Sequence, residues 1–197
     1  MEGRKTGIII LAAGNSSRLG QPKQLLPYRG KTLLRQTIEE ALAVTSCVIV
    51  VTGNENTEIE REAGTVMRVR NGDWEEGMSS SIRTGLQAMQ QCYPETQQYI
   101  FTVCDQPHIS AAVFLELIRK EESSGKGIIA SAYSGALGTP VLFSTAYDKR
   151  LSGLSGQEGA RKLILRHPED TEAVVFEKGS VDIDTIEDYK KLISKKE

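Results

Sequence analysis

The chain has 197 residues, with 24 basic and 26 acidic side chains, a formal net charge of −2 and a hydrophobic share of 39%. This length supports one sizeable core, so we expect a single domain over residues 1–197, and the near-neutral charge argues against a nucleic-acid-binding protein. The chain has no apolar run near the roughly 18–20 residues of a membrane span, and three widely spaced cysteines without a CxxC pair favour a reduced, cytoplasmic protein over a disulfide scaffold or a zinc site.

Short β-branched runs alternate with helical patterns along the first half of the chain. Residues 7–11 form a continuous apolar run that is ended by Gly14, as is typical of a strand buried on both faces. The apolar spacing then predicts, in chain order, a helix over 31–44, a second buried strand over 47–51, a polar helix over 57–63, a short strand over 66–69, a helix that starts near Met78, and a central strand over 99–103.

The second half continues the same alternation. Ser110 is expected to cap a helix, and the pattern then predicts strands over 127–131 and 140–143, a helix over 159–166, a strand over 173–176 and a last helix that opens at Asp184. This order predicts an α/β fold, a Rossmann-like three-layer sandwich in which helices cover both faces of a mostly parallel sheet. Ligands of such sheets bind beyond the carboxyl ends of the strands, so we expect the chemistry in loops that follow strands.

The loop after the first strand is rich in glycines, hydroxyls and cations. These residues are Gly14, Ser16, Ser17, Arg18, Gly20 and Lys23. Glycines let backbone N–H groups approach an anion and the two cations add charge, so we interpret the loop as a phosphate site. The loop has neither the GxGxxG pattern of dinucleotide-binding folds nor the GK[ST] ending of a P-loop. The alternative is a basic surface turn without a ligand.

From residue 11 to residue 34 the chain reads LAAGNSSRLGQPKQLLPYRGKTLL. This segment resembles the LAAGxSxRxGxxKxLL signature of the nucleotidyltransferases related to molybdenum cofactor cytidylyltransferase. Further segments similar to this family follow in order: GMSSSIRTG at 77–85, CDQP at 104–107, TPVLF at 139–143, GQEGAR at 156–161 and DIDT at 182–185. The resemblance implies a fold of the nucleotide-diphospho-sugar transferase type and a nucleotide bound by Leu11, Ala12, Ala13, Gly14, Ser16, Ser17, Arg18 and Lys23.

Acidic residues follow the central strand and precede the last helix. Asp105, at the end of the central strand, suits Mg²⁺, which prefers oxygen ligands and binds through one or two carboxylates together with substrate phosphates. The alternative is an Asp that only shapes a turn. The resemblance implies that Asp105 is a metal ligand and that an acid near residue 184 is another. We expect Asp184 in this role, with Asp182 as the alternative, although Asp184 and Glu187 also match a capping box.

A second segment rich in glycine and serine precedes a predicted helix and comprises Gly77, Ser79, Ser80 and Ser81. N–H groups and hydroxyls at such a position bind an anion or a base, and the family uses this segment around the nucleotide. A helix cap alone is the alternative, and it needs only one of the serines. The neighbouring Trp74 is either an aromatic edge of the nucleotide site or ordinary packing.

The resemblance places the second substrate at Thr139, Pro140 and Arg161. Arg161 would contact its phosphate, and the alternative is an ordinary arginine on a helix surface. The chain departs from the family on this side, because Thr139 stands where the family has His and Gln157 stands where the family has Asp. The departures concern the acceptor and leave the nucleotide motif intact.

The reaction that the resemblance implies is attack of an acceptor phosphate oxygen on the α-phosphate of an NTP, with release of pyrophosphate. Arg18 and Lys23 would neutralise the leaving phosphates, and Mg²⁺ on Asp105 and Asp184 would orient the reacting groups. Ala13 gives the motif LAAG of the cytidylyltransferases instead of the LAGG of the guanylyltransferases, which favours CTP. The acceptor would be the phosphate of molybdopterin-bound molybdenum, and the product would pass, in a transient contact, to a hydroxylase of the xanthine dehydrogenase type.

Two other functions remain open from the sequence. A sugar- or polyol-phosphate nucleotidyltransferase would use the same NTP loop, and a non-catalytic accessory protein would bind the molybdenum cofactor and deliver it to an apoenzyme. The charged loop together with Asp105 favours catalysis, because a carrier has less need of a metal-binding acid at the phosphate site. Neither a nucleic acid nor a membrane is expected as a partner.

Overall fold

The computed structural model describes residues 4–14, 19–53, 56–157 and 159–194. Its strands are β1 (Thr6–Ala12), β2 (Pro27–Tyr28), β3 (Lys31–Thr32), β4 (Val48–Thr52), β5 (Met67–Arg70), β6 (Gln98–Val103), β7 (Ile128–Tyr133), β8 (Ala136–Ser144) and β9 (Thr171–Val175). Its α-helices are α1 (Leu33–Leu42), α2 (Thr57–Ala63), α3 (Met78–Cys92), α4 (Ala111–Ser124), α5 (Asp148–Ser152), α6 (Arg161–Arg166) and α7 (Ile186–Ser194). Short 3₁₀ helices are η1 (Lys23–Leu25), η2 (Trp74–Glu76), η3 (Thr145–Tyr147), η4 (Pro168–Asp170) and η5 (Glu177–Ser180). Among the described residues, no helix has the length and hydropathy of a bilayer-spanning segment.

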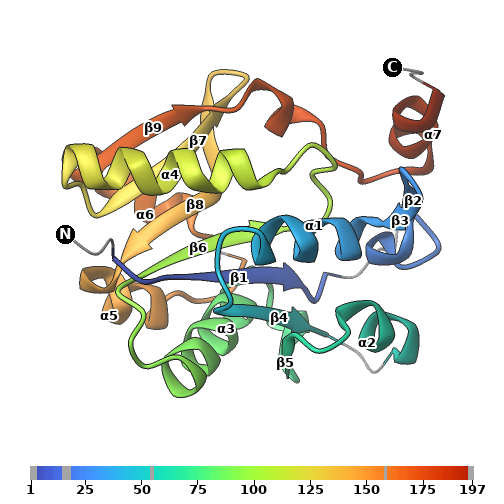
Figure 1. Cartoon of the computed structure of the whole chain (residues 1–197), viewed down its shortest axis with the longest axis horizontal. Helices are drawn as coiled ribbons and strands as arrows, with labels where there is room; N and C mark the ends of the chain where they lie inside the picture. The colour runs from blue at the N-terminus through green and yellow to red at the C-terminus, as the bar shows by residue number, and fades with distance from the viewer. Residues whose placement is uncertain (1–3, 15–18, 54–55, 158, 195–197) are drawn as a thin grey trace.

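In the described part of the chain, seven strands form one sheet in the order β5-β4-β1-β6-β8-β7-β9 (Figure 1). Neighbouring strands are parallel except where β8 pairs with β6 and β7, so the prediction of a mostly parallel α/β fold is confirmed. The reversal of β8 was not predicted. It arises because a tight turn at Ser134 and Gly135, with φ of 49° and 73°, joins β7 and β8 as a hairpin.

Successive strands of the chain are added to the sheet first on one side of β1, as β4 and β5, and then on its other side, beginning with β6. β1 pairs with β4 on one side and with β6 on the other, and Leu11 lies opposite Val103 in the register with β6. The residues after these two strands, Ala13 and Asp105, therefore leave the sheet at the same edge. This is the switch point at which open α/β sheets bind their ligands.

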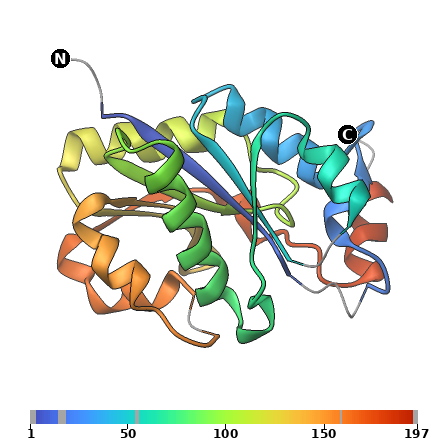
Figure 2. The same ribbon diagram turned by 90° about the horizontal axis from the view of Figure 1, so that it is seen from below.

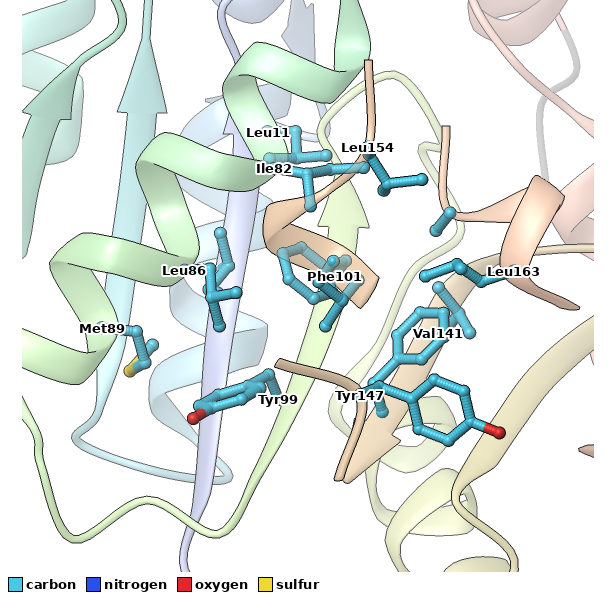
Figure 3. Close-up of a cluster of buried hydrophobic side chains, with 14 of the residues drawn as sticks. Leu11, Ile82, Leu86, Met89, Tyr99, Phe101, Val141, Tyr147, Leu154 and Leu163 are labelled. Atoms are coloured by element: carbon cyan, nitrogen blue, oxygen red, sulfur yellow. The ribbon is translucent and has the colours of Figure 1, made fainter. Parts of the chain in front are cut away.

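Helices cover both faces of the sheet (Figures 1 and 2). α1, α2 and α4 pack on the face that receives Ile8 and Ile10 of β1, and α3, α5 and α6 pack on the face that receives Ile9 and Leu11. Alternate side chains of β1 thus enter two different cores, which explains why residues 7–11 form a continuous apolar run. Figure 3 shows the second core, in which side chains of α3 lie beside Phe101 of β6.

Gly85 lets α3 lie close to the sheet. A Cβ at this position would be 2.5 Å from Cγ2 of Ile9 and 2.8 Å from Cγ2 of Val51, which is closer than packed atoms tolerate. The first turn of α3 consequently sits beside the end of β1, where Met78 and Leu11 line a common cavity.

α7 is capped by different residues than predicted. The N–H and the hydroxyl of Thr185 donate to Asp188 Oδ2 at 2.9 and 2.7 Å, and the N–H of Asp188 donates to Thr185 Oγ1 at 3.2 Å. Thr185 and Asp188 therefore form the capping box, and the predicted box of Asp184 with Glu187 is wrong. Asp184, one residue before this box, instead places its Oδ1 3.3 Å from Nζ of Lys23.

α4 receives its cap from another helix. Ser110 occupies the N-cap position as predicted, but its side chain makes no capping hydrogen bond among the described residues. Glu40 of α1 accepts the N–H of Ala111 instead, at 2.7 Å. The carboxylate therefore satisfies a backbone donor that the first turn of a helix leaves unpaired, and it ties α1 to α4.

α7 and the β2–β3 hairpin lie together at one end of the molecule (Figure 1). Leu26, Ile183 and Leu192 are buried between them, and the hydroxyl of Tyr189 donates to the carbonyl of Pro27 at 2.7 Å. This packing holds the segment before α7 next to the carboxyl end of β6.

Candidate active site

A cavity of about 440 Å³ opens at the carboxyl ends of β1 and β6. Its walls come from the end of β1, η1, the turn between β5 and α3, and the end of β6. The lining residues are Leu11, Ala12, Ala13, Gly14, Lys23, Gln24, Trp74, Glu75, Gly77, Met78, Ser81, Val103, Cys104, Asp105 and Gln157. One lysine, two acids (Glu75 and Asp105) and one serine hydroxyl thus line one hollow at the switch point of the sheet.

A buried glutamine holds the chain after β1. Gln24 is 3% exposed, and its Nε2 donates to the carbonyls of Ala12 (2.7 Å) and Gly14 (3.3 Å). These bonds fix the backbone where the first motif is expected to meet phosphate. Three of the predicted binding residues lie outside the described part of the chain: Ser16, Ser17 and Arg18.

Lys23 connects the two predicted metal ligands. Its ammonium forms a hydrogen-bonded ion pair with Oδ2 of Asp105 and lies 3.3 Å from Oδ1 of Asp184. The Lys23 and Asp105 side chains are 16% and 19% exposed, so this pair is shielded from most of the solvent. Asp184 reaches the site because the N–H of Ile183 donates to the carbonyl of Asp105 at 3.0 Å.

The charges of this cluster shift two pKa values. Burial disfavours the Lys23 ammonium, but the charge of Asp105 and its hydrogen bond outweigh burial, so the pKa of Lys23 is raised. Burial and the carboxylates of Asp184 and Asp105 raise the pKa of Asp182. The site therefore favours the charged form of Lys23. Asp182 adds a third carboxylate to the cluster, and a further cation would relieve the repulsion among the three acids.

The donor set fits a hard divalent cation. Asp105 and Asp184 converge on one ammonium, so the position between them accommodates positive charge. The described ranges contain no cluster of three or more His, Cys, Asp or Glu side chains arranged for a metal. Two carboxylates completed by substrate phosphates are the usual way in which proteins bind Mg²⁺.

The turn before α3 forms the opposite wall of the cavity. Gly77, with φ of 113°, occupies the N-cap position of α3, so none of the three serines is the N-cap residue. Ser81 lines the cavity, whereas Ser79 and Ser80 are buried outside its lining. The structure thus separates the serines that the sequence grouped together. Trp74 lines the same wall and also packs against the core beneath α3, so both interpretations of this residue stay open.

A second cavity of about 230 Å³ adjoins the first, and both are lined by Leu11, Met78 and Val103. Thr139 and Arg161, two of the predicted acceptor-binding residues, line this second cavity. Pro140 is not in its lining, and the Pro140 carbonyl accepts the hydroxyl of Ser131 at 2.7 Å. The structure therefore places two predicted acceptor residues in a cavity beside the first one and the third behind its wall.

The sequence interpretation missed three buried amides next to these cavities: Gln24, Asn71 and Gln106. Gln106 accepts the hydroxyl of Thr139 at 3.3 Å and donates to the carbonyl of Gly179 at 2.8 Å. Polar residues in loops are usually exposed, which is why these were not singled out. The adjacency of Gln106 to Asp105 was the one available signal.

The mostly parallel sheet with helices on both faces has the nucleotide-diphospho-sugar transferase fold, and a lysine–carboxylate cluster lies at its switch point. The model of one protein family, the MobA-like NTP transferase domain, matches residues 8–171. The chain belongs to this family, which confirms the resemblance seen in its motifs.

Individual relatives match most of the chain. It is 32% identical over 139 residues to the molybdenum cofactor cytidylyltransferase of Escherichia coli (strain K12), an alignment that covers 69% of this chain and 68% of the relative. It is 32% identical over 202 residues to the nicotine blue oxidoreductase of Paenarthrobacter nicotinovorans, covering 94% and 95%. The crystal structure of Rv0371c from Mycobacterium tuberculosis H37Rv superposes with a TM-score of 0.79 at 27% identity, covering 97% of this chain and 99% of the other.

Proposed function

We propose that the protein transfers CMP from CTP to the molybdenum–molybdopterin cofactor and releases pyrophosphate. One observation carries this proposal: Lys23 contacts both Asp105 and Asp184, and Lys23 and Asp105 line the switch-point cavity. Similar proteins bear the names of a cytidylyltransferase and of an oxidoreductase, so family membership alone leaves the reaction open. A lysine between two carboxylates is suited to binding phosphate groups and a metal ion, and this arrangement favours nucleotidyl transfer.

The chemistry requires positioning and charge neutralisation more than covalent catalysis. A phosphate oxygen of the acceptor attacks the α-phosphorus, the bond from the α-phosphorus to the β-bridging oxygen breaks, and pyrophosphate leaves with both electrons of that bond. Lys23, together with Arg18, binds the departing phosphates, so negative charge grows next to fixed positive charge. Mg²⁺, when held by Asp105 and Asp184, supplies further charge neutralisation at the phosphates.

The two adjoining cavities support an arrangement of two substrates. The larger one takes the nucleotide, along Ala13, Gly14 and Lys23, and the smaller one takes the acceptor, along Thr139 and Arg161. The two cavities share Leu11, Met78 and Val103, so the α-phosphate and the attacking oxygen would meet where the cavities adjoin. The chain itself thus supplies orientation, and Arg161 supplies a cation for the acceptor phosphate.

The choice of CTP rests on Ala13. This residue is 8% exposed and lines the larger cavity, and its carbonyl lies so near Gly53 that a Cβ there would be 2.7 Å away. The methyl group of Ala13 takes up room in the cavity that a glycine would leave open, which favours a base smaller than a purine. The product would be the cytosine dinucleotide form of the cofactor, passed on to a hydroxylase of the xanthine dehydrogenase type.

Pyrophosphate release from CTP, GTP and UTP, each with Mg²⁺ and with or without molybdenum cofactor, tests this proposal. We expect release only with CTP and the cofactor together. Release with a sugar or polyol phosphate as acceptor would replace the proposed reaction with the first alternative. Binding of the cofactor without turnover of any NTP would support a delivery protein instead.

A further inference from the structure

Asn71, the residue that follows β5, makes four hydrogen bonds, and two of them reach the start of α3. Its Nδ2 donates to Oγ of Ser80 at 2.8 Å and to Oγ of Ser81 at 3.0 Å. Its Oδ1 accepts the N–H of Asp73 at 3.0 Å, and its own N–H donates to the carbonyl of Thr52 at 2.8 Å. The residue is 2% exposed and does not line the nucleotide cavity, so it acts only through its neighbours.

The orientation of the Asn71 amide is fixed by its partners. The backbone N–H of Asp73 can only donate, so the atom facing it must be the amide oxygen. The NH₂ group therefore faces the two serines, and both serine oxygens act as acceptors. A flipped amide would place a donor against the Asp73 N–H.

The two serines then differ in what they do with their protons. The hydroxyl of Ser80 donates to the carbonyl of Gly77 at 2.8 Å, which stabilises the turn before α3. Ser81 lines the cavity, and its oxygen is already used as an acceptor by Asn71. Among the hydrogen bonds of the described residues, the Ser81 hydroxyl proton has no protein acceptor, so it can be donated to a ligand in the cavity.

We propose that Asn71 is a positioning residue for nucleobase recognition, which holds Ser81 as a hydrogen-bond donor to a carbonyl oxygen of the base. The inference rests on the proposed function, because it requires a nucleoside triphosphate in this cavity. Lys23 and Asp105 place the phosphates on one wall, so the base faces the other wall, which Ser81 shares with Trp74 and Gly77. Base selection thus depends on a residue that never touches the nucleotide.

Calorimetric titration of the N71A, S81A and N71A/S81A variants with CTP and with inorganic triphosphate, both with Mg²⁺, tests the inference. We expect CTP to bind about three- to tenfold more weakly to each variant, as for the loss of one hydrogen bond, and triphosphate affinity to stay unchanged. The double variant should be no weaker than S81A, because both changes remove the same contact. KM for CTP should rise while kcat is retained.

The Y147F variant is the matched control for stability. Tyr147 donates a hydrogen bond to Asp170 Oδ2 at 2.8 Å and lines neither cavity, so its loss lowers the melting temperature without changing CTP affinity. Unchanged CTP affinity in S81A would overturn the inference even if N71A failed to fold. Equal losses for CTP and triphosphate in N71A would also overturn it. Absence of CTP binding by the wild-type protein would overturn the proposed function as well.

Discussion

Nζ of Lys23 lies 3.3 Å from Oδ1 of Asp184, although 161 positions separate the two residues in the chain. The same ammonium is paired with Asp105, so one lysine is the shared counter-ion of both acids that are proposed to hold Mg²⁺ and leaves a net negative charge between them. A cation site between two carboxylates and a phosphate-binding lysine are therefore built from the same three side chains. In the proposed reaction, a substrate phosphate that draws Lys23 away would leave the two carboxylates to the metal.

Replacement of Lys23 by Met should strengthen metal binding in the absence of nucleotide. The variant loses the ammonium that competes with a divalent cation for Asp105 and Asp184, so we expect Mn²⁺ affinity to rise on the order of tenfold. Paramagnetic resonance of free Mn²⁺ measures this directly. The K23M/D184N double variant should lose the gain, and an unchanged Mn²⁺ affinity in K23M would contradict the shared-site interpretation.

Turnover should depend on Asp105 and Lys23. The D105A and K23A variants are each expected to lower kcat on the order of 10²–10³-fold, because each removes a preorganised charge at the reacting phosphates. Pyrophosphate release under saturating CTP and acceptor gives the measurement, and circular dichroism checks that the sheet is intact. Near-normal turnover of folded D105A would remove Asp105 from the mechanism.

Arg161 should act on the acceptor alone. In R161A we expect the KM for the acceptor to rise about 10- to 100-fold, as for the loss of a charge-assisted hydrogen bond, with the KM for CTP unchanged. Arg166 lies on the same helix, is exposed and is outside the lining of the acceptor cavity, so R166A is the matched control. Similar effects of both variants would point to general electrostatics.

Stability should depend on pH through Asp182. Its pKa is raised by burial, Asp184 and Asp105, so the folded state binds this proton more tightly than the unfolded chain does. Ionised Asp182 therefore destabilises the fold above its folded pKa, and this penalty disappears below the ordinary value of 3.8. D182N should raise the melting temperature at pH 7 and have a smaller effect near pH 4. An equal effect at both pH values would rule out the electrostatic cause.

The cap of α4 gives a prediction for stability alone. E40A should lower the free energy of unfolding by about 0.5–2 kcal/mol, because the N–H of Ala111 loses its acceptor. S110A should change it by less than about 0.5 kcal/mol, since the Ser110 side chain makes no capping bond among the described residues. Urea denaturation compares the two, and the reverse ranking would assign the cap to Ser110.

The strand order and layers follow from patterns that the sequence displays openly. The continuous apolar run of β1 must be covered on both sides, and alternating helices provide that cover. The hairpin of β7 and β8 was missed although Ser134-Gly135 is a turn dipeptide, because Pro140 was taken as the start of the second strand. Register and strand direction depend on pairing, which a single strand does not reveal.

The candidate site was less accessible from sequence than the fold. Motif resemblance placed Lys23, Asp105 and Asp184 together, and the structure brings their side chains into contact. The amides of Gln24 and Asn71 were invisible, because the burial of a loop residue depends on segments distant in sequence. Their hydrogen bonds shape the cavity without being part of any recognisable motif.

The hydrogen bond from Ile183 to Asp105 couples the position of Asp184 to the end of β6. β9, the last described strand of the sheet, ends at Val175, so the sheet and the pair of Lys23 with Asp105 are built entirely from residues that precede Asp184. Docking of the segment between η5 and α7 is therefore the folding step that would bring the second acid to the proposed metal site.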